Sequence, residues 1–235
     1  MNLELRDRCV LLTGAAGHLG KAVAGAFGEA GARLVLVDLH AKALEAAFTA
    51  SPTTALVAAN LLDAEGTQRA VAQAVERFGK IDVLCHLAGG FRMGETVHET
   101  SPATWDFLFD INGRTLVNIA RAVVPQMIRQ GGGKIVTVGA NAAQKGAAQM
   151  GAYCAAKSGV IRLSEAMSAE LKEQNINVNC VLPTIIDTPD NRSAMPDTDP
   201  ARWVAPRALA DVILFLSSDA ARAVHGAAIP VAGLS

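Results

Sequence analysis

The chain has 235 residues, of which 51% are hydrophobic, and its formal net charge is −1. This length and apolar content allow one domain with a large core, and the near-neutral charge is unlike the basic surface that nucleic-acid binding requires. No run of about 18 apolar residues occurs, so no membrane span is predicted.

The ends and the cysteines indicate a cytoplasmic protein. The N-terminal residues MNLELRDR are charged and lack the apolar segment of a secretory signal. Three of the four cysteines stand in apolar runs, which predicts buried thiols, and no two form a CxxC pair. His18 and His86 have no third ligand at a metal-binding spacing, so no metal site is expected.

Short β-branched or leucine-rich runs alternate with longer alanine-rich segments of helical spacing. Strands separated by helices form βαβ units, and strands with little polar alternation are covered on both faces. We therefore expect one doubly wound parallel α/β domain over residues 1–235. The predicted strands are 8–13, 33–38, 54–58, 81–87, 134–139, 176–182 and 227–231. The predicted helices are about 18–30, 41–50, 64–78, 102–130, 151–174 and 207–218.

A glycine-rich turn follows the first predicted strand. The segment VLLTGAAGHLGKAVA places Gly14, Gly17 and Gly20 between that strand and the start of a helix. Glycines there let the backbone turn tightly and approach a pyrophosphate at the positive end of the helix. A glycine triplet alone is weak evidence, but its strand–turn–helix context makes a dinucleotide site a strong prediction.

Two carboxylates follow the second and third predicted strands. Asp38 is placed to accept hydrogen bonds from both hydroxyls of an adenosine ribose and to repel a 2′-phosphate, which favours NAD(H) over NADP(H). The alternative is that Asp38 caps the helix beginning near Ala41. Asp63 is expected to cap the helix that begins at 64, and a second role beside the adenine stays open.

A tyrosine and a lysine stand one helical turn apart after the fifth predicted strand. The segment VGANAAQKGAAQMGAYCAAK contains Tyr153, the only tyrosine of the chain, and Lys157. We expect the ammonium to favour the phenolate and to lower the pKa of Tyr153 from about 10. Tyr153 is then a candidate general acid or base. The fourth strand ends in HLAGG, whose small residues leave room for a cofactor.

These motifs resemble those of the short-chain dehydrogenase/reductases over essentially the full chain. In that family a Tyr-x-x-x-Lys pair works with an asparagine and a serine. The resemblance implies that Tyr153 is the acid/base in hydride transfer, that Lys157 tunes it and holds the nicotinamide ribose, and that Asn112 of FDINGRT holds a relay water. The serine position falls on Ala140.

The same resemblance implies a Rossmann-type sheet of seven parallel strands in the order 3-2-1-4-5-6-7. It also implies a homodimer or homotetramer built through the helices at 102–130 and 151–174. Two motifs depart from the family pattern: His18 stands where the middle glycine is usual, and Pro183 is followed by threonine rather than glycine. The predicted NAD(H) contacts are Gly14, Gly17, His18, Leu19, Gly20, Asp38, Asp63, Ala88, Gly89, Tyr153, Lys157, Pro183, Ile185 and Thr188.

Residues 183–206 interrupt the regular pattern, because five prolines and several Asp and Asn residues forbid a long helix. A loop of that length is typical of a lid, so we expect a substrate lid at about 184–206. This loop and residues 135–157 resemble the dihydropteridine reductase branch of the family, which also has alanine at the serine position. That resemblance implies a quinonoid or pterin-like small-molecule substrate. The alternatives are an ordinary carbonyl or alcohol dehydrogenase, in which a neighbour such as Asn141 replaces the serine, and a non-catalytic NAD-binding protein.

Overall fold

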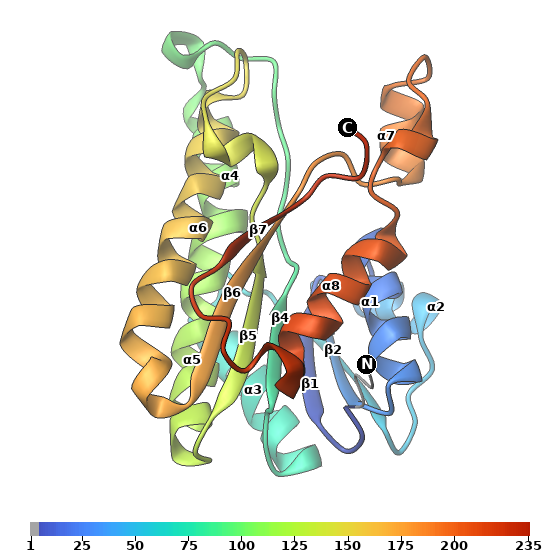
Figure 1. Cartoon of the computed structure of the whole chain (residues 1–235), viewed down its shortest axis with the longest axis vertical. Coiled ribbons are helices and arrows are strands. Elements are labelled where there is room, and N and C mark those ends of the chain that lie inside the picture. The colour runs from blue at the N-terminus through green and yellow to red at the C-terminus, as the bar shows by residue number, and fades with distance from the viewer. Residues whose placement is uncertain (1–4) are drawn as a thin grey trace.

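Seven short apolar segments form one parallel sheet in the computed structural model, which describes residues 5–235 (Figure 1). The strand order is β3-β2-β1-β4-β5-β6-β7, which confirms the predicted fold class and strand order. The strands are β1 (Cys9–Thr13), β2 (Arg33–Asp38), β3 (Thr54–Ala58), β4 (Val83–His86), β5 (Gly133–Val138), β6 (Ile176–Pro183) and β7 (Ala228–Val231).

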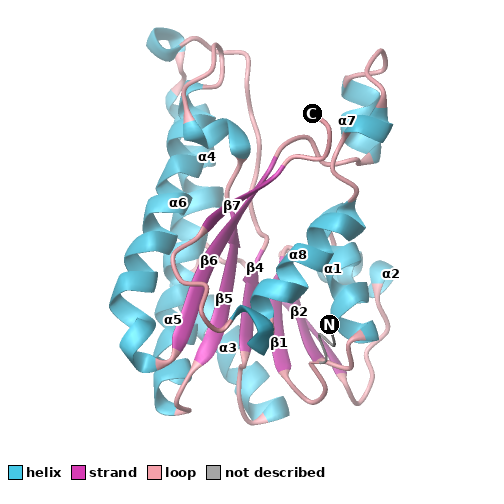
Figure 2. Cartoon of the chain, viewed as in Figure 1, coloured by secondary structure: helices cyan, strands magenta, loops and turns pink. Residues whose placement is uncertain are grey.

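Helices cover both faces of the sheet (Figure 2). One face is covered by α1 (His18–Glu29), α2 (Ala41–Ala47) and α8 (Pro206–Ser217). The other is covered by α3 (Ala64–Phe78), α5 (Thr115–Arg129) and α6 (Gly151–Leu171), with α4 (Pro102–Phe109) packed on α6. No helix within residues 5–235 is long and apolar enough to cross a bilayer. The expectation of no secretory signal concerns residues 1–8, of which 1–4 lie outside the described residues.

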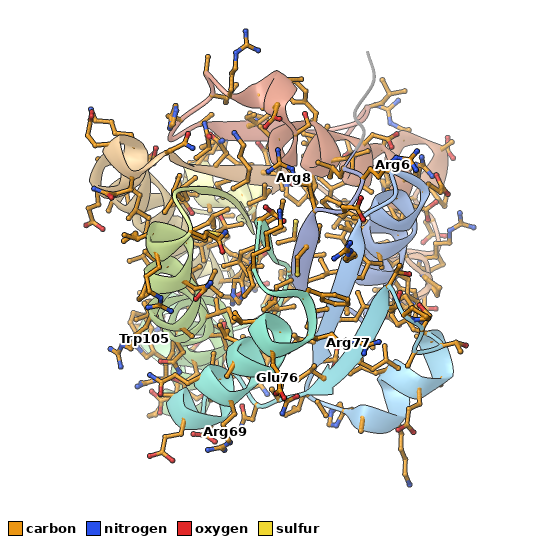
Figure 3. All side chains as sticks on the ribbon, turned by 90° about the horizontal axis from the view of Figure 1, so that it is seen from below. Arg6, Arg8, Arg69, Glu76, Arg77 and Trp105 are labelled. Atoms are coloured by element: carbon orange, nitrogen blue, oxygen red, sulfur yellow. The ribbon has the colours of Figure 1, made fainter. Side chains whose placement is uncertain are left out.

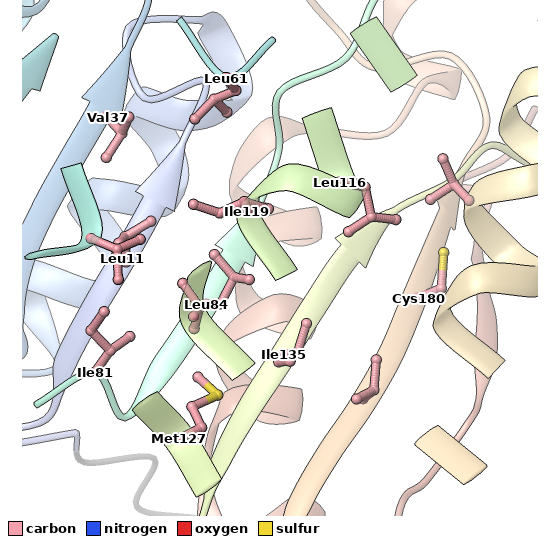
Figure 4. Close-up of a cluster of buried hydrophobic side chains, with 14 of the residues drawn as sticks. Leu11, Val37, Leu61, Ile81, Leu84, Leu116, Ile119, Met127, Ile135 and Cys180 are labelled. Atoms are coloured by element: carbon pink, nitrogen blue, oxygen red, sulfur yellow. The ribbon is translucent and has the colours of Figure 1, made fainter. Parts of the chain in front are cut away.

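Alternate residues of each central strand enter one of two hydrophobic layers. Leu11 and Ile135 face the layer of α3, α5 and α6, where they meet Ile119 and Met127 (Figure 4). Val10, Leu12 and Val136 face the layer of α1 and α8. Each fully buried side chain of this kind contributes roughly 1.5–3 kcal/mol. The two layers hold the strand ends, and the loops that leave them, in fixed positions.

The predicted helix 102–130 is found as a continuous helical segment that contains a π turn. A π turn at Asp110–Arg114 separates α4 from α5. The amide of Asn112 donates to Leu108 O at 2.9 Å and to Gly90 O at 3.1 Å, so its side chain ties the wide turn to the loop after β4. The sequence predicted the extent of this helix but not the π turn, which lies at a candidate catalytic residue, where π turns are frequent.

The lid contains short helices only, as its prolines predict. Residues Pro189–Ala194 form α7, and Thr188 caps it by accepting from Asn191 N at 3.2 Å. A bridge between Ile186 and Val204 closes the base of the loop.

Candidate active site

The carboxyl edge of the sheet collects the loops that carry the predicted site residues. The loops after β1, β4, β5 and β6 all leave the sheet at this edge, at the top of Figure 1. Ligands of open parallel sheets bind at such an edge, where neighbouring loops diverge.

The glycine loop is shaped by two close backbone approaches. A Cβ on Gly14, whose φ is +68°, would lie 2.9 Å from Ala88 N, and a Cβ on Gly20 would lie 2.5 Å from Ala15 O. Gly17 is the N-cap of α1 and provides no side-chain cap, so the first N–H groups of that helix stay available to an anion. These features fit a dinucleotide pyrophosphate.

The start of α1 also approaches the lid. His18 Nδ1 lies 3.9 Å from Asp190 Oδ2 in α7. Leu19 packs against the hydrophobic layer that covers the α1 face of the sheet. The glycine loop and the lid are therefore neighbours across the carboxyl edge.

Asp38 contacts the glycine loop. Its Oδ2 accepts from Ala16 N at 3.0 Å. The N-cap of α2 is His40, with no side-chain cap, so the alternative role of Asp38 as the cap of that helix is not found. Asp63 does cap α3 by accepting from Glu65 N at 3.1 Å, and its second role beside an adenine stays a prediction.

Lys157 and Asn112 meet beside Gly89. A Cβ on Gly89 would lie 2.9 Å from Asn112 Oδ1 and 3.0 Å from Lys157 Nζ. Asn112 Oδ1 also accepts from Gly90 N at 3.1 Å. Lys157 Nζ donates to Val138 O at 2.8 Å, and its side chain is only 6% exposed. The glycine at position 89 leaves the space between the two polar groups open.

Burial sets the protonation of the predicted acid/base pair. Burial, and secondarily the Cys154 thiol, raise the pKa of Tyr153 to about 12. Burial also lowers the pKa of Lys157 to about 8, against a smaller opposing effect of Cys180. The predicted lowering of the Tyr153 pKa by Lys157 is not found, because burial of the phenol dominates the shift and Lys157 is not among the groups that cause it. Tyr153 is therefore a protonated phenol at neutral pH.

Ala140, which the resemblance places at the usual serine position, is a buried methyl group. Ala140 is 5% exposed and lies in the hydrophobic layer with Ile161 and Leu182. The amide oxygen of the neighbouring Asn141 accepts from Gln144, so this side chain is bound within its own turn.

The sixth-strand residues reach the same edge. Pro183 ends β6 opposite Val231, and Ile185 O accepts from Val204 N at 2.8 Å. Thr184 donates to Ala232 O at 2.9 Å, which fixes the start of the lid to the chain after β7.

The sequence did not reveal the contact partners of two residues near the site, Phe91 and His86. The ring of Phe91 meets the ring of Tyr153 edge to face, with centroids 4.8 Å apart. His86 lies between Thr13 and Thr115 within hydrogen-bond distance of both hydroxyls. The position of His86 at the start of HLAGG, two residues before Ala88, was the available signal for its place near the site.

A cavity of about 400 Å³ lies at the opposite, amino edge of the sheet. Arg8 lies at this edge (Figure 3) and pairs with Asp82 and Asp219. Lys134 donates to Asn177 Oδ1 at 2.6 Å. Helix C-termini, which attract cations, gather at this edge of a parallel α/β fold. The charges of the cavity therefore have partners within the fold, and the candidate chemistry lies at the carboxyl edge.

Comparison with known proteins identifies close likenesses over the whole chain. Residues 8–199 match the family model described as short chain dehydrogenase. D-threitol dehydrogenase of Mycolicibacterium smegmatis is 32% identical over 99% of this chain and 94% of that protein. L-xylulose reductase of Bos taurus is 31% identical over 99% of this chain and 98% of that protein. The crystal structure of a 3-ketoacyl-(acyl-carrier-protein) reductase from Brucella melitensis complexed with NADH has a TM-score of 0.88 at 27% identity and 98% coverage of both chains.

The buried ammonium predicts a pH-dependent contribution to stability. Lys157 loses its proton near pH 8 in the folded protein and near pH 10.5 in the unfolded chain. Between these values the unfolded chain binds more protons, so the free energy of unfolding rises with pH by up to about 1.4 kcal/mol per unit. Denaturant unfolding at several pH values gives the free energy of unfolding of the wild type and of Lys157→Met. The difference between the two proteins isolates the contribution of Lys157, because the contributions of the other titrating groups cancel. A difference that stays constant from pH 7 to pH 10.5 would show that the ammonium is not destabilised by burial.

Proposed function

The chain belongs to the short chain dehydrogenase family and is an oxidoreductase of that family, and we propose that it uses NAD(H) with Tyr153 as the proton-transferring group. The proposal is carried by one observation: Lys157 and Asn112 converge beside Gly89, at the edge that also bears the glycine loop. When bound, the dinucleotide supplies or accepts the hydride. The residues of the chain bind it, exclude water and manage the proton.

Proton transfer follows from the protonation states of the buried pair. Tyr153 is a phenol at neutral pH, which suits an acid that donates its proton to a substrate in the direction of reduction. Lys157, with a pKa of about 8, exchanges protons near neutral pH and is suited to resupply the site. Asn112 presents its amide oxygen to the same space and is proposed to hold the water through which that proton passes.

Tyr153→Phe tests this role with little change of shape. Loss of a positioned general acid lowers kcat by about 10²–10⁴. The dissociation constant for NADH, measured by fluorescence titration, should stay close to the wild-type value. Full turnover by Tyr153→Phe would exclude the proposed acid. NADH binding by a wild type that turns over no carbonyl or quinonoid compound would favour a non-catalytic NAD-binding protein.

The choice of NAD(H) over NADP(H) is supported by Asp38. Its carboxylate stands at the end of β2 and contacts the glycine loop through Ala16 N, where a 2′-phosphate would meet a negative charge. A ribose hydroxyl that donates to a carboxylate gains about 1.5–3 kcal/mol.

Asp38→Asn should reduce the NADH-over-NADPH ratio of kcat/KM by about tenfold or more, since hydrogen bonds to charged groups carry that magnitude. The asparagine oxygen still accepts from Ala16 N, so the loop is preserved and the charge alone is removed. Steady-state kinetics with both dinucleotides gives the ratio. A wild type that prefers NADPH would overturn the role of Asp38.

We propose a substrate that needs little polarisation at the reacting oxygen or nitrogen. The absence of one hydrogen-bond donor, as at Ala140, costs about 10²–10³ in rate for a simple ketone. A quinonoid ring is already electrophilic, and its reduction restores conjugation. Phe91 and Met93, which are 54% and 55% exposed, offer an apolar surface beside Tyr153 for such a flat ring. An ordinary alcohol or carbonyl substrate is the second candidate, because several relatives are named for polyols and sugars.

Ala140→Ser separates these two substrate classes. If the missing hydroxyl limits the enzyme, this variant should raise kcat/KM for a simple ketone by up to about 10²–10³ and leave a quinonoid dihydropterin nearly unchanged. Asn141→Ala is the matched control and should alter neither, because that side chain is bound to Gln144. Strong ketone reduction that Asn141→Ala abolishes would assign the donor role to Asn141 and contradict the proposed substrate class.

The expected homodimer or homotetramer is supported by apolar side chains on the outer surfaces of α4 and α5. Trp105, Val117 and Ile128 are 47%, 41% and 42% exposed. A cytoplasmic location and a small-molecule substrate complete the proposal.

A further inference from the structure

Four consecutive hydrogen bonds cross the site beneath the carboxyl edge. Ala88 N lies 3.3 Å from Thr13 Oγ1, and Thr13 Oγ1 lies 2.9 Å from His86 Nδ1. On the other side of the ring, His86 Nε2 lies 3.3 Å from Thr115 Oγ1, which lies 2.7 Å from Ile111 O. The chain of bonds therefore begins in the loop after β4 and ends in the π turn.

The end of this series of bonds at Ile111 O determines the direction of the bonds on the Nε2 side of the ring. Ile111 O is a carbonyl and only accepts, so the hydroxyl of Thr115 donates to it and accepts from His86 Nε2–H. Thr13 Oγ1 accepts from Ala88 N–H and has a second lone pair, so the contacts alone allow Nδ1 either to accept from the Thr13 hydroxyl or to donate to it. In the neutral imidazole, with its proton on Nε2, Nδ1 accepts from the Thr13 hydroxyl.

The surroundings keep the imidazole in that state. His86 is 2% exposed, and burial, with a smaller effect of the Lys157 charge, lowers the pKa of His86 to about 3. The imidazole of His86 therefore does not become a second cation beside the Lys157 ammonium. Buried polar groups that are fully satisfied in this way define one arrangement of the segments that they join.

The series of hydrogen bonds ends at two different parts of the site, the loop after β4 and the π turn. At one end, Ala88 N is the atom that a Cβ on Gly14 would approach to 2.9 Å, so Ala88 sets the position of the glycine loop. At the other end, Ile111 directly precedes Asn112 within the π turn. Thr13 and His86 are also register partners on neighbouring strands, which fixes the spacing between these ends.

We propose that His86 is a positioning residue whose two ring nitrogens separately hold the glycine loop and the Asn112 turn. This inference rests on the proposed function, which gives the glycine loop its role in dinucleotide binding and Asn112 its role in proton transfer. His86 itself transfers no proton and touches no substrate.

Two conservative variants separate the two nitrogens. The amide of Asn reaches the position of Nδ1, and the amide of Gln reaches that of Nε2. His86→Asn keeps the bond to Thr13 and loses the bond to Thr115, so kcat should fall about three- to tenfold with the Kd for NADH nearly unchanged. His86→Gln keeps the bond to Thr115 and loses the bond to Thr13, so the Kd for NADH should rise about three- to tenfold with kcat less affected.

Matched hydroxyl variants check the assignment. Thr115→Val should reproduce the kinetic pattern of His86→Asn. Thr137→Val is the control, because Thr137 pairs with His86 on the neighbouring strand but bonds to Ser164, outside the chain of bonds. It removes a buried hydroxyl of the same kind and should change neither kcat nor the Kd for NADH beyond its effect on thermal stability.

A readout without turnover separates this inference from the proposed function. Amide hydrogen exchange should become faster at residues 110–114 in His86→Asn and at residues 14–17 and 88–90 in His86→Gln. In nitrogen-15 spectra of histidine-labelled protein, His86 should show one protonated and one unprotonated nitrogen throughout the neutral range. Equal losses of kcat and of NADH affinity in both variants, or the same exchange pattern in both, would overturn the positioning role. A wild type that binds no NADH would overturn the proposed function, and the exchange patterns would still decide the role of His86.

Discussion

A single buried ammonium group constrains the whole carboxyl edge of this protein. Removing an ion from water costs several kcal/mol unless polar groups replace the lost hydration. Lys157 receives one hydrogen bond acceptor from Val138 O at the end of β5, and Asn112 Oδ1 stands on the far side of Gly89. The end of β5, the π turn that carries Asn112 and the glycine at position 89 therefore act together around the Lys157 ammonium.

The same burial acts on the acid and on its neighbour, and in both cases it favours the uncharged form. It raises the pKa of Tyr153 to about 12 and lowers the pKa of Lys157 to about 8, so the two pKa values move apart. A phenol that keeps its proton and an amine that readily exchanges one are suited to reduction of a substrate. Ala140 fits this account, because the proton donor then needs only a substrate that accepts a proton readily.

The fold and much of the site could be predicted from the sequence because the relevant signals are local. Alternation of strands and helices predicted the parallel sheet, and the family resemblance implied its strand order. The glycine loop and the Tyr-x-x-x-Lys pair each lie within one short segment. The π turn could not be predicted, because Asn112 bonds to Gly90 across the fold. The direction of the Tyr153 pKa shift was also missed, since a sequence shows a charged neighbour but not the depth of burial. The two partners of His86, Thr13 and Thr115, come from β1 and α5, which are far apart in the sequence.

The ionisation of the single tyrosine tests this account most directly. The chain has one tyrosine, so the ultraviolet absorbance of phenolate reports on Tyr153 alone during a pH titration of the folded protein. The account predicts no phenolate below pH 10, the ordinary value for this group, and ionisation only toward pH 12. Phenolate absorbance that develops near neutral pH in the folded protein would contradict it, because Lys157 would then dominate over burial and Tyr153 would be a base rather than an acid.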